Sequence, residues 1–167
     1  MADVDRLWAP WRTEFLSQPT RRGCFLCAAW KGRNDPAARV VARSTTVFAI
    51  LNRYPYNNGH VLVAPARHVG AFNRLTKAEW LDLLTLTQRL MRRLSRRLRA
   101  QGFNLGMNLG RVAGAGVPGH LHLHIVPRWN GDTNFMPIVG RTKVISQSLD
   151  ELYRALADRT SRRPSRT

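Results

Sequence analysis

Residues 119–128 read Gly-His-Leu-His-Leu-His-Ile-Val-Pro-Arg, so three histidines alternate with apolar residues. The apolar alternation predicts a strand over residues 121–126. Successive side chains of a strand point to opposite faces, so His120, His122 and His124 would share one face. The apolar residues between them would then pack into a core from the other face.

Three imidazoles on one strand face allow three interpretations. Neutral imidazoles bind metal ions, and an oriented imidazole can act as a nucleophile. The third interpretation is the polar face of a half-buried strand, which is more usually built from Thr, Lys and Glu. The run therefore favours a metal site, a catalytic site or both.

The chain has only two cysteines, Cys24 and Cys27, in a CxxC spacing. This spacing suits half of a zinc site, a redox pair or two ordinary buried thiols. A redox pair normally lies at a helix start in a β-α-β setting, which the surrounding pattern does not supply. A tetrahedral zinc site needs two further ligands, and His68 and His120 are the candidates.

Short apolar runs predict the rest of a sheet. These strands are expected over residues 40–42 and 47–51 as a hairpin, over 60–65 after the turn signal Asn57-Asn58-Gly59, and over 103–109. Together with the histidine run they make about five strands.

One long helix is predicted to start at Thr76, whose hydroxyl can cap the Glu79 amide while the Glu79 side chain reaches back. It should run to about Gln101, where Gly102 would supply a left-handed cap. A short helix is expected over residues 149–157. Strands clustered around one long helix predict an α+β domain with a mostly antiparallel sheet.

The chain is strongly basic, with 27 Lys+Arg against 10 Asp+Glu and a formal net charge of +17 over 167 residues. A protein with such a charge can attract nucleic acid, an anionic membrane surface or a small polyphosphate as a partner. Six arginines lie between residues 88 and 99, alternating with apolar residues at helical spacing. This pattern favours the solvated face of an amphipathic helix over a nucleic-acid groove, so nucleic acid is not expected as a partner.

No apolar run approaches the roughly 18 residues that span a bilayer, and the first residues lack the pattern of a signal peptide. We therefore expect a cytoplasmic protein with no membrane partner. Residues 159–167 are rich in Arg, Ser and Thr and are expected to form a disordered basic tail.

The histidine run resembles the signature of the histidine triad superfamily of nucleotidyl hydrolases and transferases, in which three histidines alternate with apolar residues. Residues 48–55 and 59–65 are similar to the nucleotide-binding half of the fragile-histidine-type hydrolases. Residues 7–12, Leu-Trp-Ala-Pro-Trp-Arg, with 23–27, resemble the bacterial branch described as diadenosine tetraphosphate phosphorylase- or hydrolase-like. The likeness covers about residues 7–158. It implies one histidine triad domain over 1–158, with an N-terminal extension over 1–39.

The resemblance also implies a reaction. His122 would attack the α-phosphate of a dinucleoside polyphosphate in line and form a covalent nucleotidyl-histidine. Water or inorganic phosphate would then release the mononucleotide. His124 would contact the phosphate near the leaving oxygen, and His60 would line the same site. The nucleotide-binding positions implied are Asn52 at the ribose, Asn108 near the scissile phosphate, and the loop glycines Gly114 and Gly116.

The nitrogen of His122 that does not attack must be held as N–H, and we expect a backbone carbonyl to hold it. In zinc-containing relatives the metal ligands would be Cys24, Cys27, His68 and His120. Four protein ligands leave no open position, so the zinc would be structural. No organic cofactor is implied.

The sequence departs from the family pattern at one place, which leaves open whether water or inorganic phosphate releases the mononucleotide. Hydrolases of the family often carry Gly-Gln-Ser or Gly-Gln-Thr shortly before the triad, whereas residues 113–119 read Ala-Gly-Ala-Gly-Val-Pro-Gly. Hydrolysis and phosphorolysis therefore both remain, and the alternatives are a nucleoside phosphoramidase or a non-catalytic nucleotide- or RNA-binding module.

The resemblance also implies an assembly. Relatives are commonly homodimers, with the long helix and a sheet edge in the interface.

Overall fold

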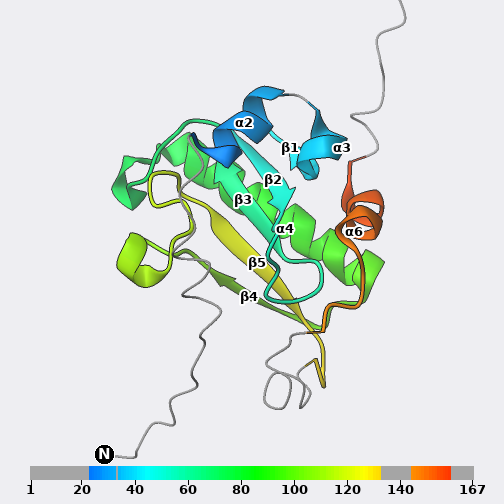
Figure 1. Cartoon of the computed structure of the whole chain (residues 1–167). Coiled ribbons are helices and arrows are strands. Elements are labelled where there is room, and N and C mark those ends of the chain that lie inside the picture. The colour runs from blue at the N-terminus through cyan, green and yellow to red at the C-terminus, as the bar shows by residue number, and fades with distance from the viewer. Residues whose placement is uncertain (1–22, 33, 133–143, 159–167) are drawn as a thin grey trace, which may run out of the picture.

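The computed structural model describes residues 23–32, 34–132 and 144–158. Five strands form one sheet in the order β1-β2-β3-β5-β4, and every neighbouring pair is antiparallel (Figure 1). The strands are β1 (Val40–Arg43), β2 (Val47–Leu51), β3 (Val61–Pro65), β4 (Gly102–Gly106) and β5 (Leu123–Arg128). The predicted α+β fold with about five antiparallel strands is confirmed.

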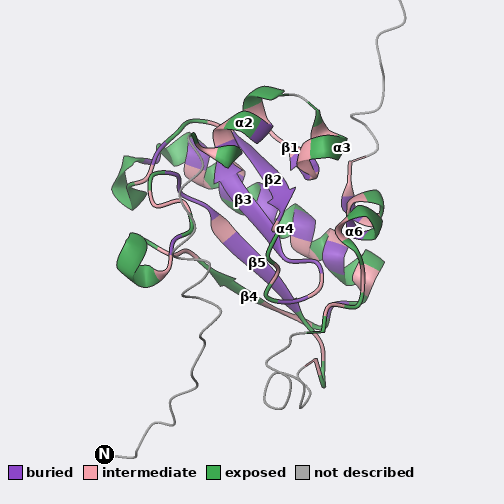
Figure 2. Ribbon diagram, in the orientation of Figure 1, coloured by how far each residue is buried: buried purple, intermediate pink, exposed green. Residues whose placement is uncertain are grey.

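The central strands pack into a different core on each face, because successive side chains of a strand point to opposite faces. Alternate residues of β2, beginning with Val47, pack against the long helix α4 (Lys77–Leu98). The residues between them, Phe48 and Ile50, pack against α2 (Phe25–Gly32). Figure 2 shows that the central strands are buried, with exposed residues concentrated on the helices and loops around them. The sheet is thus covered on both faces.

The start of α4 is the predicted one. The Thr76 hydroxyl accepts a hydrogen bond from the Glu79 N–H, and the Glu79 carboxylate accepts one from the Thr76 N–H. Its buried leucines, Leu83, Leu86, Leu90 and Leu94, lie at helical spacing and face the sheet. In Figure 1 this helix crosses behind the sheet.

The predicted end of this helix is wrong. The helix ends at Leu98, and Arg99, not Gly102, adopts the left-handed conformation, with φ 55°. Gly102 is instead the first residue of β4 and pairs with Arg128. The Gln101 N–H already donates to the Arg128 carbonyl at 2.9 Å, so the chain must leave the helix early enough to reach the sheet.

Two strand boundaries also differ from the prediction. Strand β4 ends at Gly106 rather than residue 109, and β5 runs from Leu123 to Arg128 rather than over 121–126. His120 and His122 therefore lie in the segment that leads into β5, and only His124 lies within the strand. The predicted strands at 40–42, 47–51 and 60–65 match β1, β2 and β3 to within one residue.

Two short helices and two 3₁₀ turns complete the described chain. Helix α3 (Asp35–Ala38) leads into β1, and α6 (Leu149–Leu156) packs its Leu152 and Leu156 into the core shared with α4. The 3₁₀ turns are η1 (Phe72–Arg74) and η2 (Arg111–Ala113). No helix in these described ranges is long and apolar enough to cross a membrane.

Most of the arginines between residues 88 and 99 are exposed, as the helical pattern predicted, but Arg93 is half-buried. Its guanidinium donates to the Leu156 carbonyl at the end of α6 and pairs with Asp158. Arg93 therefore fastens α6 onto α4, whereas Arg92 beside it faces solvent.

Replacing Arg93 with methionine should lower the free energy of unfolding by about 1–3 kcal/mol, because the Leu156 carbonyl and the Asp158 carboxylate lose a charged donor. Urea unfolding monitored by circular dichroism measures the change. Arg92→Met is the matched control and should stay within about 0.5 kcal/mol of wild type. Equal effects of the two substitutions would contradict the role given to Arg93.

Candidate active site and metal cluster

His122 has a fixed tautomer. Its Nδ1 lies 2.8 Å from the backbone oxygen of His120, and a carbonyl oxygen only accepts, so Nδ1 carries the proton. Nε2 is then left with its lone pair. This is the backbone carbonyl expected from the sequence, and it leaves the ring nitrogen distant from the backbone as the nucleophilic atom.

His60 and His124 are linked by a hydrogen bond, and a backbone amide sets the tautomers of both rings. The Tyr56 N–H donates to Nδ1 of His60 at 3.0 Å, so the His60 proton lies on Nε2. That Nε2 lies 2.9 Å from Nδ1 of His124 and donates to it. The His124 proton therefore lies on Nε2.

This series of hydrogen bonds ends at Nε2 of His124, a donor that has no partner in the described residues. His124 is 8 % exposed, and its Nε2 is buried with no hydrogen-bond partner in the described part of the chain. A buried N–H without an acceptor is unfavourable by about 1–3 kcal/mol, so this donor is available to a bound acceptor. The ring of His124 lies 5.1 Å from that of His122, which places this donor beside the candidate nucleophile.

The environment keeps these imidazoles neutral. Burial, with smaller contributions from the neighbouring histidines, lowers the pKa of His60 to about 3 and that of His124 to about 4. Burial also lowers the pKa of His122, although the His120 carbonyl acts in the opposite direction. At pH 7 the site therefore contains neutral imidazoles, the form that a nucleophile requires.

The stability of the fold should accordingly fall with pH below about 6.5. The folded pKa values of His60 and His124 lie below the unfolded value, so between pH 6.5 and 5 the unfolded chain binds more protons. Each histidine then removes up to about 1.4 kcal/mol per pH unit. Urea unfolding at pH 7.5, 6.0 and 5.0 measures the slope. A stability that does not change across this range would contradict the buried, neutral state.

The candidate nucleotide-binding residues lie on two loops, and Asn52 lies beside His60. The Asn52 side chain accepts a hydrogen bond from the Tyr54 N–H at 3.0 Å, and its Nδ2 lies 3.2 Å from Nδ1 of His60. Asn108 donates to the Gly114 carbonyl at 3.3 Å and ties the glycine-rich loop together. Gly114 has φ 83°, a conformation that favours glycine, and Gly116 is exposed on the same loop.

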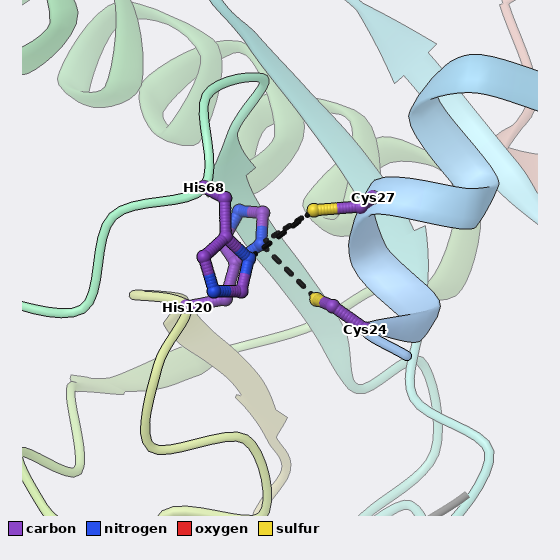
Figure 3. A group of neighbouring side chains, drawn as sticks. All are labelled: Cys24, Cys27, His68 and His120. Carbon is purple, nitrogen blue, oxygen red and sulfur yellow. Dashed lines mark hydrogen bonds between the residues drawn. The ribbon is translucent and has the colours of Figure 1, made fainter. Parts of the chain in front are cut away.

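Four side chains from three separate segments meet beside the triad (Figure 3). Cys24 and Cys27 come from the start of α2, His68 from the loop after β3, and His120 from the segment before β5. Their ligand atoms all lie within 4.8 Å of one another. Cys24 Sγ is 3.2 Å from Nδ1 of His120, and Cys27 Sγ is 3.2 Å from Nδ1 of His68.

These separations fit a tetrahedral metal site. Bonds of about 2.3 Å to sulfur and 2.0 Å to nitrogen place the ligand atoms of a tetrahedron roughly 3.3–3.8 Å apart. His120 also donates from Nε2 to the Pro65 carbonyl at 2.8 Å, which leaves Nδ1 unprotonated toward the cysteines. The Cys₂His₂ cluster can therefore hold a metal ion.

Two parts of this site were not predicted from the sequence. The Tyr56 N–H and the Pro65 carbonyl each set the tautomer of a histidine, but they are backbone atoms, and any residue type carries them. The turn signal at Asn57-Asn58-Gly59 was the available hint that the chain folds back beside His60. The structure has this turn, with the His60 N–H donating to the Asn57 carbonyl.

The chain is similar to several known proteins. The family profile described as "HIT domain" matches residues 33–131. The AP-4-A phosphorylase of Mycobacterium tuberculosis is 41% identical over 169 residues, which cover 96% of this chain and 87% of that protein. An uncharacterized HIT-like protein of Methanocaldococcus jannaschii is 32% identical over 133 residues, covering 80% of this chain and 98% of the relative.

Among solved structures, a Zn-bound histidine triad family protein from Mycobacterium smegmatis superimposes with a TM-score of 0.66. It is 28% identical, and the match covers 83% of this chain and 92% of that one. The structural match extends well beyond the histidine run.

Proposed function

Because this chain belongs to the HIT domain family, we propose that it cleaves dinucleoside polyphosphates at the α-phosphate through a covalent nucleotidyl-His122 intermediate. The observation that carries the proposal is the pair of fixed tautomers, a lone pair on Nε2 of His122 beside an unpartnered N–H on His124. The name of the Mycobacterium tuberculosis relative supports diadenosine tetraphosphate as the substrate.

In the first step Nε2 of His122 forms a bond to the α-phosphorus, and the bond from that phosphorus to the bridging oxygen breaks. The His122 ring becomes cationic, and the His120 carbonyl on its Nδ1–H stabilises that charge. The departing oxygen belongs to a polyphosphate, which is stable as an anion near pH 7. A hydrogen bond from Nε2–H of His124 to this oxygen is therefore sufficient.

In the second step water or inorganic phosphate attacks the same phosphorus and releases His122 as a neutral imidazole. With diadenosine tetraphosphate, water gives ATP and AMP, and phosphate gives ATP and ADP. We assign nucleotide contacts to Asn52, which lies beside His60, and to Asn108 and the backbone N–H groups of Gly114 and Gly116, which belong to the glycine-rich loop before the histidine run.

Incubation with diadenosine tetraphosphate, with and without inorganic phosphate, tests this function directly. Phosphorolysis predicts ADP only when phosphate is present, and hydrolysis predicts AMP in both reactions. Preferential turnover of adenosine phosphoramidate would favour a phosphoramidase instead. If no dinucleoside polyphosphate or nucleoside phosphoramidate is consumed, the enzymatic function is wrong.

We further propose that the cluster of Cys24, Cys27, His68 and His120 binds structural zinc. The support is the convergence of the four ligand atoms within 4.8 Å, the second hydrogen bond of His120 and the Zn-bound relative. Bound zinc would join α2 to the two segments that carry the histidines and would leave no open position to activate water. We place the protein in the cytoplasm, where both thiols would stay reduced.

A homodimer is the assembly that we propose. Strand β4 is at the edge of the sheet, and its Leu105 is exposed, as are Leu81 and Leu84 of α4. Apolar side chains on an edge strand and a helix face are suited to burial against a second copy. Light scattering after gel filtration should give twice the 19.0 kDa chain mass, and a monomer would contradict the proposal.

A further inference from the structure

The side chain of Tyr56, in the loop between β2 and β3, packs on two buried histidines of the candidate active site. Its ring is stacked on that of His124, with the centroids 5.7 Å apart and the planes 4° from parallel. It also lies 4.7 Å from the ring of His60. The rings of His60 and His124 are themselves 5.1 Å apart. The three rings therefore form one compact group, with every pair at the separation of packed aromatic rings.

Tyr56 is much more exposed than the histidines on which it packs. It is 54 % exposed, whereas His60 is 1 % exposed and His124 is 8 % exposed. Tyr56 also belongs to none of the apolar clusters formed by the described residues. An aromatic side chain stabilises a fold mainly when it is buried in a core, so the core does not account for this one. Its ring instead covers the two imidazoles.

The orientation of His124 depends on this cover. Its only hydrogen bond among the described residues is the one that Nδ1 accepts from Nε2 of His60 at 2.9 Å. A single hydrogen bond still allows the ring to turn about the axis of that bond. The rings of His60 and His122 meet the His124 ring at 39° and 49°, so neither lies flat against it. The nearly parallel Tyr56 ring therefore limits the rotation.

The direction of Nε2–H of His124 matters for the proposed reaction. This donor is the group assigned to the leaving oxygen, and hydrogen bonds weaken steeply when the donor is not aligned with the acceptor. A donor that is held in place before the reaction stabilises the charge that develops on the departing atom. A ring that fixes the plane of His124 therefore acts on the step in which the leaving group departs.

We propose that Tyr56 is a positioning residue, whose ring holds the plane of His124 so that Nε2–H points at the leaving oxygen. The inference rests on the proposed cleavage at His122. It gives the Tyr56 side chain a part in the departure of the leaving group and none in holding the substrate. Loss of the ring should therefore lower kcat on diadenosine tetraphosphate and leave KM within about threefold of wild type.

Two substrates with different leaving groups test this role. The p-nitrophenyl and phenyl esters of AMP present the same adenosine and the same phosphorus to His122. p-Nitrophenolate is a stable anion, whereas phenolate is more basic and depends more on a hydrogen bond as it departs. Tyr56→Ala should therefore lower kcat/KM on the phenyl ester about tenfold more than on the p-nitrophenyl ester. The Tyr56 N–H that sets the tautomers remains in this variant, so only the ring is tested.

Three further variants serve as controls. Tyr56→Phe retains the ring and should keep wild-type kcat/KM on both esters. Tyr56→Leu keeps apolar volume without a flat face and should change the ratio of the two values in the same direction as alanine, so a folding defect in Tyr56→Ala does not hide the effect. Phe72→Ala removes a ring of similar exposure that packs on Trp80, and should leave the ratio unchanged.

Nuclear magnetic resonance tests the positioning without any substrate. The proton on Nε2 of His60 is buried in its hydrogen bond to His124, so its exchange with water should be slow. It should give a downfield proton resonance in wild type and in Tyr56→Phe. Tyr56→Ala should broaden or remove this resonance, because water reaches the hydrogen bond once the ring is gone.

Two results would overturn the positioning role while the proposed function stands. One is an equal loss on both esters in Tyr56→Ala and Tyr56→Leu, which would make Tyr56 a support of the fold only. The other is a His60 resonance that Tyr56→Ala leaves unchanged, which would show that the ring does not hold the pair. If wild type consumes neither diadenosine tetraphosphate nor the esters, the proposed function itself fails.

Discussion

Replacing His122 with asparagine should reduce turnover of diadenosine tetraphosphate at least about 10⁴-fold, because no other group replaces the attacking Nε2. The asparagine amide can still donate to the His120 carbonyl, so the local fold should persist. Steady-state kinetics measures the loss. Mass spectrometry after an alkaline quench should detect one added nucleotidyl group on wild type and none on the variant.

The control for this experiment is Arg92→Met, an exposed substitution on α4 that should keep wild-type turnover. The free energy of unfolding of His122→Asn should lie within about 1 kcal/mol of wild type, which separates loss of chemistry from loss of structure. A variant that keeps more than a tenth of the activity, or still carries the nucleotidyl group, would show that another residue is the nucleophile.

The strands and the helix start could be predicted because short-range patterns determine them. Val47–Leu51 is a continuous apolar run whose residues alternate between the two cores, and only a strand buried on both faces accommodates that pattern. The start of α4 depends on Thr76 and Glu79, three residues apart. In both cases the signal lies within a few neighbouring residues of the sequence.

The end of α4 could not be predicted because distant residues determine it. A residue such as Arg99 in the left-handed region is unfavourable by about 1–2 kcal/mol relative to glycine. Two contacts offset this: Trp129 donates from Nε1 to the Leu98 carbonyl at 3.0 Å, and Gln101 joins the sheet beside Arg128. Gly102 was the better local signal, but the pairing of β4 with β5 determines where the helix stops.

The same distinction applies to the site. Residue type and spacing indicated the three histidines of residues 120–124 and the four metal-ligand candidates, since imidazole and thiolate chemistry belongs to those side chains, and the family resemblance implied the role of His122. The tautomers of His60 and His124 depend on a backbone amide of Tyr56, and the orientation of His120 depends on the Pro65 carbonyl. Only the folded chain specifies these contacts.

Replacing Cys24 with serine should remove the metal and destabilise the fold. The wild-type protein should contain one zinc per chain by elemental analysis, and Cys24→Ser should contain almost none, because a neutral hydroxyl is a poor ligand beside three softer ones. Zinc that binds only the folded state stabilises it by about 4 kcal/mol when its free concentration is 1,000 times its Kd. Urea unfolding of the variant, and of wild type treated with a chelator, should show losses of that size.

The matched control for the metal is Ala28→Ser, which adds the same hydroxyl to an exposed position of the same helix. It should keep one zinc per chain and wild-type stability. Metal loss should also lower turnover, though less than His122→Asn, since the His120 carbonyl that orients His122 belongs to a residue of the cluster. A wild-type chain without metal, or a Cys24→Ser chain with a full equivalent, would contradict the structural zinc.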